Sequence, residues 1–295
     1  MKEKIDKFRK YCELIQMNTH TINAYTRALN RYFTWLNDNG LYDLRVKKTD
    51  VVDFKNHLRQ ENTLASGTIN NILGAIKLYY KYLMSNGLVI KNPVDRSCFV
   101  KRKQKLIRNI LDEKKLGIFL SKIHLETSRD YMFKSMCEIM YSCGLRISEC
   151  LTIKEEYIDR FGGYLTIFDI KKKSLRTLPI GDTALRWLFM YIDNHRKDLV
   201  SEEELKEGYI YPHSQKHFLY FQSRLARESK KHGFPRLTSH SFRHCCATHL
   251  LKKGASVKHV QEFLGHNRLR TTQVYTHLIK DDLKDLVKKH HPRGS

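Results

Sequence analysis

The chain has 295 residues, with 54 lysine and arginine against 31 aspartate and glutamate, which gives a formal net charge of +23. This charge favours a polyphosphate partner, while 41% hydrophobic and 11% aromatic residues exclude a disordered basic tail. The longest apolar candidate for a membrane span, residues 187–192, is far too short for one. The first residues lack the apolar core of a signal peptide, so we expect a cytoplasmic protein of two domains.

The cysteine pattern supports the same compartment. The chain has seven cysteines, an odd number, and no two of them form a CxxC pair. A secreted disulfide framework or a zinc ribbon would show an even number or close pairs. We therefore predict buried, reduced thiols.

Residues 1–100 show apolar side chains at helical spacing in four segments, which predicts a bundle of four helices. Thr49 and Ser66 are predicted to cap the third and fourth helices, and Gly40 and Gly87 to follow the second and fourth. The predicted core positions are Ile5, Phe8, Cys12 and Ile15; Ile22, Tyr25, Leu29, Tyr32 and Leu36; Val52, Phe54 and Leu58; and Ile69, Ile72, Leu73, Ile76, Tyr79, Tyr80 and Leu83.

A basic segment follows the bundle. Residues 101–108 hold five basic residues and no acidic one, and they come after Asn92-Pro93, a pair that disfavours a helix. We interpret this segment as an extended interdomain linker that also contacts phosphate; a solvated run of charge is the alternative. The predicted DNA contacts are Lys101, Arg102, Lys103 and Lys105.

Residues 109–295 predict a mainly helical α+β domain. Two short runs of β-type residues, 164–170 and 175–180, flank Lys171-Lys172-Lys173-Ser174 and indicate a hairpin with a lysine-rich tip. Helices are predicted near 112–123 and 129–142, from about Arg146 after a break at 143–144, and at 182–194, 215–232, 239–252, 256–264 and 271–289. The whole chain is thus predicted to be mainly α, with one small sheet.

Several kinds of chemistry lack their motifs in this sequence. There is no GxxxxGK[ST] loop, no HExxH and no acidic cluster typical of a two-metal nuclease. His240 and His244 are one helical turn apart and could bind a metal with Cys245 or His266, but we expect no metal and no other cofactor. Metal-free cleavage of a phosphodiester needs cations for the nonbridging oxygens, a nucleophile and a proton donor. Arginine suits the first task because its planar fork stays charged.

Four motifs occur in an order that carries a resemblance to a known family. They are residues 143–149 (CGLRISE), 240–243 (HSFR) and 264–266 (LGH), and then Tyr275, spread over about 130 residues. They resemble the Arg, Lys, His-x-x-Arg, His, Tyr pattern of the tyrosine recombinase (phage integrase) family. Residues 1–100 are also similar to the SAM-like core-binding domain of that family, so the resemblance covers nearly the whole chain.

The resemblance implies a role for each matched residue. Tyr275 would attack the scissile phosphate and form a 3′-phosphotyrosyl bond, releasing a 5′-hydroxyl. Arg146 and Arg243 would hold the nonbridging oxygens. His240 would act as acid and base near the tyrosine, and His266 would donate a hydrogen bond to the phosphate.

Two further roles depend on local matching. Residues 176–179 match the right half of the β-turn motif of the family, which places Lys171 at the lysine that protonates the leaving 5′-oxygen. The glycines of that motif are absent, so Lys172 and Lys173 stay open as alternatives. Glu149 follows Arg146 by three residues and would orient the cations of the site.

The sequence at 290–293 resembles the His-Pro-Arg tail of the Xer-type members, and we expect no arm-binding domain before the helical bundle. This subgroup implies a tetramer on two duplex DNA sites, formed by one chain or with a related recombinase. Two alternatives remain: relaxation of DNA in the manner of a type IB topoisomerase, and DNA binding without cleavage. The target site, and the choice between chromosome-dimer resolution and integration or excision of a mobile element, are not predicted.

Overall fold

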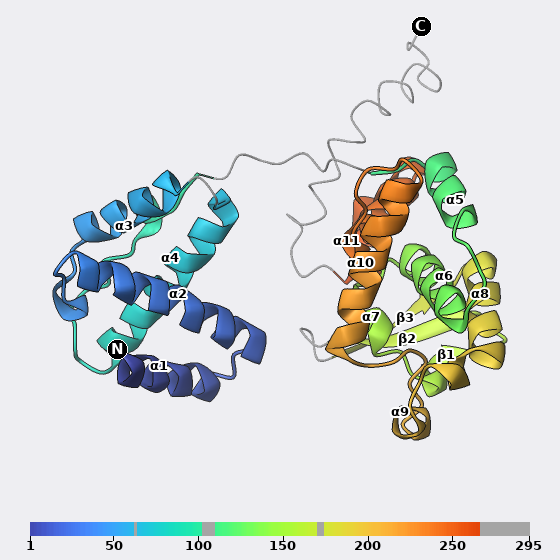
Figure 1. Cartoon of the computed structure of the whole chain (residues 1–295), viewed down its shortest axis with the longest axis horizontal. Helices are drawn as coiled ribbons and strands as arrows, with labels where there is room; N and C mark the ends of the chain where they lie inside the picture. Colours follow the sequence, from blue (N-terminus) through green and yellow to red (C-terminus); the bar gives the residue numbers. More distant parts are fainter. Residues whose placement is uncertain (62–63, 102–109, 170–173, 266–295) are drawn as a thin grey trace, which may run out of the picture. The chain divides into compact units, whose positions relative to one another are not determined.

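The computed structural model describes residues 1–61, 64–101, 110–169 and 174–265, and it divides the chain into two compact units, Met1–Gln104 and Lys105–Ser295 (Figure 1). Three of the predicted linker contacts, Arg102, Lys103 and Lys105, lie outside the described residues, and Lys101 is exposed at the edge of the gap. Among the described residues, no helix is long and apolar enough to span a bilayer.

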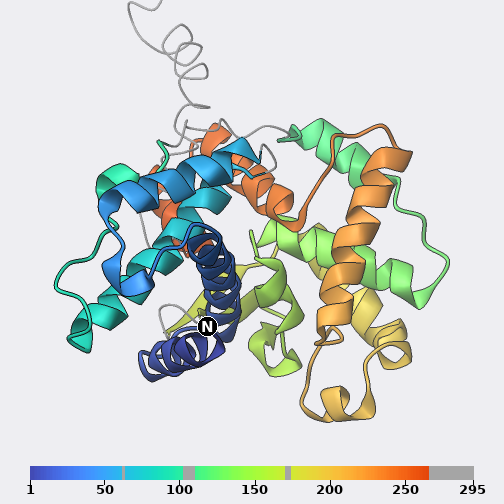
Figure 2. The ribbon, with the colours of Figure 1, turned by 60° about the vertical axis from the view of Figure 1, so that its left-hand side comes forward.

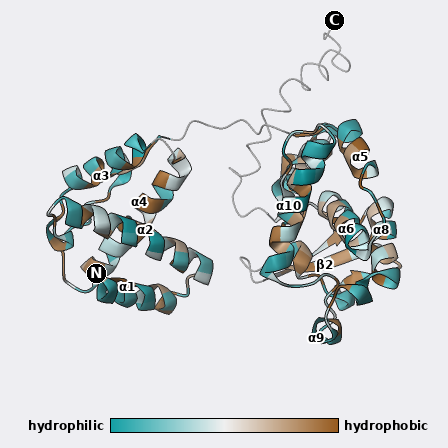
Figure 3. Ribbon diagram, viewed as in Figure 1, coloured by the Kyte–Doolittle hydropathy of each residue, from teal (hydrophilic) through white to brown (hydrophobic). Residues whose placement is uncertain are grey.

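The first unit contains the four predicted helices, with a short 3-10 helix after the second and another after the fourth. They are α1 (Lys2–Leu14), α2 (Thr19–Asp38), η1 (Asp43–Arg45), α3 (Lys48–Gln60), α4 (Ser66–Ser85) and η2 (Arg96–Cys98). Each long helix buries one apolar face, and hydrophilic and hydrophobic residues alternate along these helices (Figure 3). The expected helical bundle is therefore confirmed.

Several details of this unit differ from the prediction. Lys47 and Ala65 occupy the N-cap positions, so Thr49 and Ser66 already lie inside their helices. The Asp50 carboxylate accepts the backbone N–H of Lys47 at 2.8 Å, which starts α3 earlier. Ile15 lies beyond the last residue of α1 and is 45% exposed. The side chains of Tyr25 and Val52 are only partly buried, and Val51 takes the buried position instead of Val52.

A buried carboxylate links three parts of the first unit. Asp43 accepts a hydrogen bond from the Tyr79 hydroxyl at 2.7 Å and pairs with Lys4 Nζ at 2.6 Å. Its carbonyl oxygen accepts from the Tyr80 hydroxyl at 2.8 Å. Because Asp43 is 5% exposed, these contacts compensate for its burial and hold η1 against α1 and α4.

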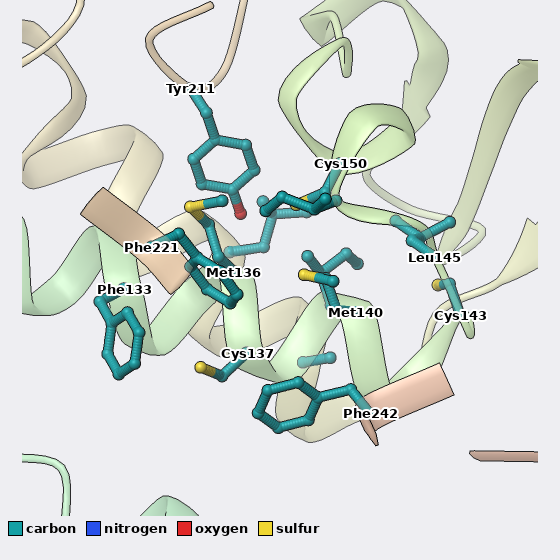
Figure 4. Close-up of a cluster of buried hydrophobic side chains, with 14 of the residues drawn as sticks. Phe133, Met136, Cys137, Met140, Cys143, Leu145, Cys150, Tyr211, Phe221 and Phe242 are labelled. Carbon is teal, nitrogen blue, oxygen red and sulfur yellow. The ribbon is translucent and has the colours of Figure 1, made fainter. Parts of the chain in front are cut away.

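The second unit is built around one buried helix. Its helices are α5 (Glu113–Ser121), α6 (Ser128–Ser142), α7 (Ile147–Leu151), α8 (Asp182–Asn194), α9 (Glu202–Lys206), α10 (Gln215–Lys231), α11 (Ser239–Lys252) and α12 (Val257–Leu264), with 3-10 helices η3 (Glu155–Tyr157) and η4 (Arg196–Asp198). Every residue of α6 from Met132 to Met140 is buried, as expected of a helix covered on all sides. Phe221 of α10 and Phe242 of α11 lie in the same cluster as Met136 and Met140 (Figure 4).

A three-stranded antiparallel sheet, ordered β1 (Ile158–Asp159), β2 (Tyr164–Asp169) and β3 (Ser174–Pro179), completes this unit. The predicted hairpin corresponds to β2 and β3. Strand β1 was not predicted because it has only two residues. Helix α9 has only five residues and was also missed. The same elements can be followed in the turned view of Figure 2.

All seven cysteines lie in the described residues, and all are buried and free. Two are in the first unit and five in the second. Burial raises the pKa of Cys12 and of Cys245 to about 11. The predicted burial of the cysteines is confirmed.

Candidate active site

Three of the six predicted catalytic residues are described, together with Glu149, and they lie in the second unit. Arg146 precedes α7, and His240 and Arg243 are on the first turns of α11. Lys171, His266 and Tyr275 lie outside the described residues, as does the predicted helix at 271–289. The described residues thus include half of the predicted catalytic set.

Arg146 is placed by the turn between α6 and α7. It occupies the N-cap of α7, so the helix begins at Ile147, one residue after the predicted start at about Arg146. Glu149 accepts the backbone N–H of Arg146 at Oε2 (2.8 Å) and the Arg146 Nη1 at Oε1 (2.7 Å). A glutamate at the third helical position commonly satisfies an unpaired N–H in this way. The Arg146 side chain stays 29% exposed. Its guanidinium is therefore anchored to Glu149 through Nη1 and is partly open to solvent.

Arg243 is held more deeply. Its side chain is 6% exposed, and Nη1 donates to the carbonyl oxygen of Gly144 at 2.7 Å. Nη2 donates to the carbonyl oxygen of Leu264 at the end of α12. The Arg243 Nη1 also lies 3.8 Å from Glu149 Oε2. One guanidinium thus joins the α6–α7 turn to the chain immediately before His266.

Arg176 of β3 belongs to the same cluster, and the sequence interpretation gave it no role. Its Nη2 lies 3.2 Å from Glu149 Oε2, and its side chain is 13% exposed. A signal was present in the sequence, because alternation along β3 places Arg176 on the same face as Leu178. A charged residue in an apolar row indicates a buried partner.

Among the described residues, the cluster contains more basic than acidic side chains. Three guanidinium groups face one carboxylate, which leaves a formal charge of +2 on these four side chains. Partial burial, and then the charges of Arg243 and Arg146, lower the pKa of His240 below its usual value. His240 is accordingly neutral at neutral pH and can accept a proton. The arrangement can hold an anion beside a neutral base.

The other histidines of α11 have different surroundings. Burial, followed by His240 and Arg243, lowers the pKa of His244 to about 4. His249 has the Tyr141 hydroxyl 2.8 Å from Nδ1 and the carbonyl oxygen of Leu111 2.9 Å from Nε2. These contacts give His249 a structural role. Within the described ranges, no three histidine, cysteine or acidic side chains are grouped so that they could hold a metal ion.

Comparison with family models gives two matches. Residues 109–281 match the phage integrase family, and residues 5–88 match the phage integrase N-terminal SAM-like domain. Among the relatives, tyrosine recombinase XerD of Listeria monocytogenes serotype 4b is 32% identical, over 94% of this chain and 94% of that protein. Tyrosine recombinase XerC of Anoxybacillus flavithermus is 30% identical, over 93% of this chain and 92% of that protein.

Comparison with solved structures gives the same fold. The XerH site-specific recombinase bound to a palindromic difH substrate has a TM-score of 0.76 at 20% identity, covering 96% of this chain and 83% of that one. The Tn1549 transposon integrase in complex with a circular intermediate DNA has a TM-score of 0.74 at 18% identity, covering 97% and 98%. These similarities extend over both units of the chain.

Proposed function

The chain belongs to the phage integrase family of tyrosine recombinases, and we propose that it is a site-specific recombinase that cleaves and rejoins duplex DNA through a 3′-phosphotyrosyl intermediate. The observation that carries this proposal is that Arg146 and Arg243 both contact one carboxylate, Glu149, while burial and the charges of these two arginines lower the pKa of His240. This cluster is a site for the scissile phosphate.

The two arginines would act on the phosphate in different ways. Negative charge accumulates on the nonbridging oxygens as the phosphate is attacked, and fixed cations stabilise that charge without reorganising. Arg243 is immobilised by two backbone carbonyls and therefore provides a fixed positive charge. Arg146 is partly exposed and donates to the bound phosphate from the solvent side.

The remaining steps are proposed for residues outside the described ranges. Tyr275 attacks the phosphorus in line, and neutral His240 accepts its proton. Lys171, with Lys172 and Lys173 as alternatives, protonates the departing 5′-oxygen, and His266 donates a hydrogen bond to the phosphate. The phosphotyrosyl bond conserves the energy of the phosphodiester, so a second 5′-hydroxyl can attack it without ATP.

We further propose how the chain engages its partners. The first unit acts as the core-binding domain, the second as the catalytic domain, and the linker at 101–108 contacts phosphate between them. The XerH and Tn1549 integrase structures contain DNA, which supports duplex DNA as the partner. We propose that the chain acts in the cytoplasm as a tetramer on two DNA sites, formed by this chain alone or with a related recombinase.

A covalent-adduct assay tests this function. A duplex site is first selected from random DNA by binding and then nicked just downstream of the cleavage position, so that the short fragment released with a 5′-hydroxyl diffuses away. We expect an adduct with the wild-type chain and with Tyr164→Phe, a matched change of an exposed tyrosine, and none with Tyr275→Phe, which still binds DNA. If no adduct forms, the chain binds without cleaving; an adduct with relaxation of supercoils but no strand exchange indicates a topoisomerase.

A further inference from the structure

Arg176 occupies a position of β3 that the fold otherwise fills with apolar side chains. In the β2–β3 register it lies opposite Ile167, and the neighbouring pair on the same face is Leu165 with Leu178. These three apolar residues are at most 5% exposed. Burying a guanidinium in such a row is unfavourable unless an ion pair compensates for the lost hydration. One compensating group is the carboxylate of Glu149.

The same carboxylate oxygen binds the rest of the cluster. Glu149 Oε2 lies 3.2 Å from Arg176 Nη2, accepts the backbone N–H of Arg146 at 2.8 Å and lies 3.8 Å from Arg243 Nη1. Arg176 therefore connects the sheet to the carboxylate that both proposed phosphate-binding arginines contact. A change at Arg176 alters the position of the strand relative to those arginines.

Strand β3 also continues the segment that carries the proposed general acid. It begins at Ser174, immediately after Lys171, Lys172 and Lys173. Arg176 follows Lys171 by five residues and Lys173 by three. The contact between Arg176 and Glu149 is thus the nearest described anchor, along the chain, between these lysines and the arginine cluster.

We propose that Arg176 is a positioning residue for proton transfer to the leaving group. By fixing β3 to Glu149, it fixes the strand that directly follows Lys171, Lys172 and Lys173, and so favours protonation of the 5′-oxygen. This inference rests on the proposed recombinase function. A general acid must lie within hydrogen-bond reach of its acceptor, and small displacements reduce such steps strongly.

The test uses two versions of the same suicide duplex. One has the natural phosphodiester, and the other has sulfur in place of the bridging 5′-oxygen. A thiolate leaves without protonation because a thiol is far more acidic than an alcohol. For Arg176→Gln we expect single-turnover cleavage of the natural duplex to fall about 100-fold. On the sulfur-containing duplex the variant cleaves about as fast as the wild-type chain, and its affinity for DNA is unchanged.

Two further variants make the result specific. Arg176→Lys keeps the charge without the planar fork, so we expect an intermediate rate on the natural duplex and the wild-type rate on the sulfur duplex. Arg160→Gln is the matched control, since Arg160 forms an ion pair with Asp193 at the surface, and both of its rates should equal those of the wild-type chain. If Arg176→Gln does not fold, as its melting curve would show, Arg176→Lys decides the question.

The outcomes separate this inference from the function on which it rests. If Arg176→Gln is slowed equally on both duplexes, Arg176 acts through the arginines or the fold, and the inference is wrong. A wild-type rate for this variant on the natural duplex would also overturn it. If the wild-type chain itself forms no adduct with either duplex, the proposed function fails instead.

Discussion

Arg243 donates a hydrogen bond of 2.7 Å to the carbonyl oxygen of Gly144, which lies 99 residues earlier in the chain. Gly144 has a positive φ of 59° and follows the last turn of α6. A proposed phosphate-binding arginine is thus placed by the main chain of a glycine turn. The position of the guanidinium depends on the conformation of that turn.

We predict that Gly144→Ala is strongly destabilising. A β-carbon at this position would overlap the side chain of Leu264, and the left-handed conformation costs a non-glycine residue about 1–2 kcal/mol. Overpacking adds about 1–3 kcal/mol. Urea denaturation should show the summed loss, and DNA cleavage should fall because Arg243 and the end of α12 shift together.

The matched control is Gly233→Ala. Gly233 has a similar φ of 70°, but a β-carbon there meets no atom within 4 Å. This variant should show only the backbone cost. Equal losses for the two glycine variants would mean that the contact with Leu264 has no energetic effect.

Glu149→Gln should weaken both the fold and the reaction. The change leaves three guanidinium groups around a neutral amide, and breaking a buried ion pair on one side costs about 3–5 kcal/mol. The loss here belongs at the lower end, since the Arg146 side chain is 29% exposed. Denaturation measures the first effect and adduct formation the second. Glu3→Gln, in an exposed pair with Lys7, should change neither; a Glu149 variant with wild-type stability would contradict the prediction.

The stability of the protein should fall in mild acid, in part through His244. The folded-state pKa is about 4, whereas an unfolded histidine titrates near about 6.5. Between these values the unfolded chain binds more protons, so the free energy of unfolding decreases as the pH falls from 6.5 towards 4. At pH 5 this contribution is about 2 kcal/mol. Denaturation of the wild-type chain and of His244→Gln at pH 7 and pH 5 should differ in pH dependence by about that amount, and identical dependences would contradict it.

Neutralising the linker should reduce the salt dependence of DNA binding. We assume that Lys101, Arg102, Lys103 and Lys105 each contact a phosphate. Changing all four to glutamine then makes the negative slope of log K against log salt shallower by about 3–4. The affinity at low salt falls as well. Fluorescence anisotropy over a range of salt concentrations measures the slope. An unchanged slope would make the segment a spacer that does not touch DNA.

The helices could be predicted because burial of one face repeats along the sequence. The spacing of Phe8, Leu29 and Leu73 is visible without a structure, and all three are buried. Helix starts were less predictable, since a cap depends on which backbone N–H is left unpaired. The Asp50 carboxylate accepts a hydrogen bond from the backbone N–H of Lys47, so α3 begins before Thr49.

Three members of the described arginine–glutamate cluster could be predicted, whereas Arg176 and most of the geometry could not. Resemblance to the family identified Arg146, Glu149 and Arg243, but no spacing rule shows that Arg243 contacts Gly144 across the domain. The contact of Arg176 with Glu149 depends on the β2–β3 register and on the approach of the sheet to α7. Such contacts are set by tertiary packing, which a single sequence does not display.

Because every cysteine is buried, no native thiol should compete with an introduced cysteine in site-directed labelling. Maleimide dyes react with thiolates at an accessible surface, and none of the seven thiols offers one. A cysteine placed at Leu88 of the first unit and another at Phe161 of the second, both exposed side chains, would be the reactive pair. Energy transfer between two dyes at these positions would then follow the separation of the two units in solution as duplex DNA is added.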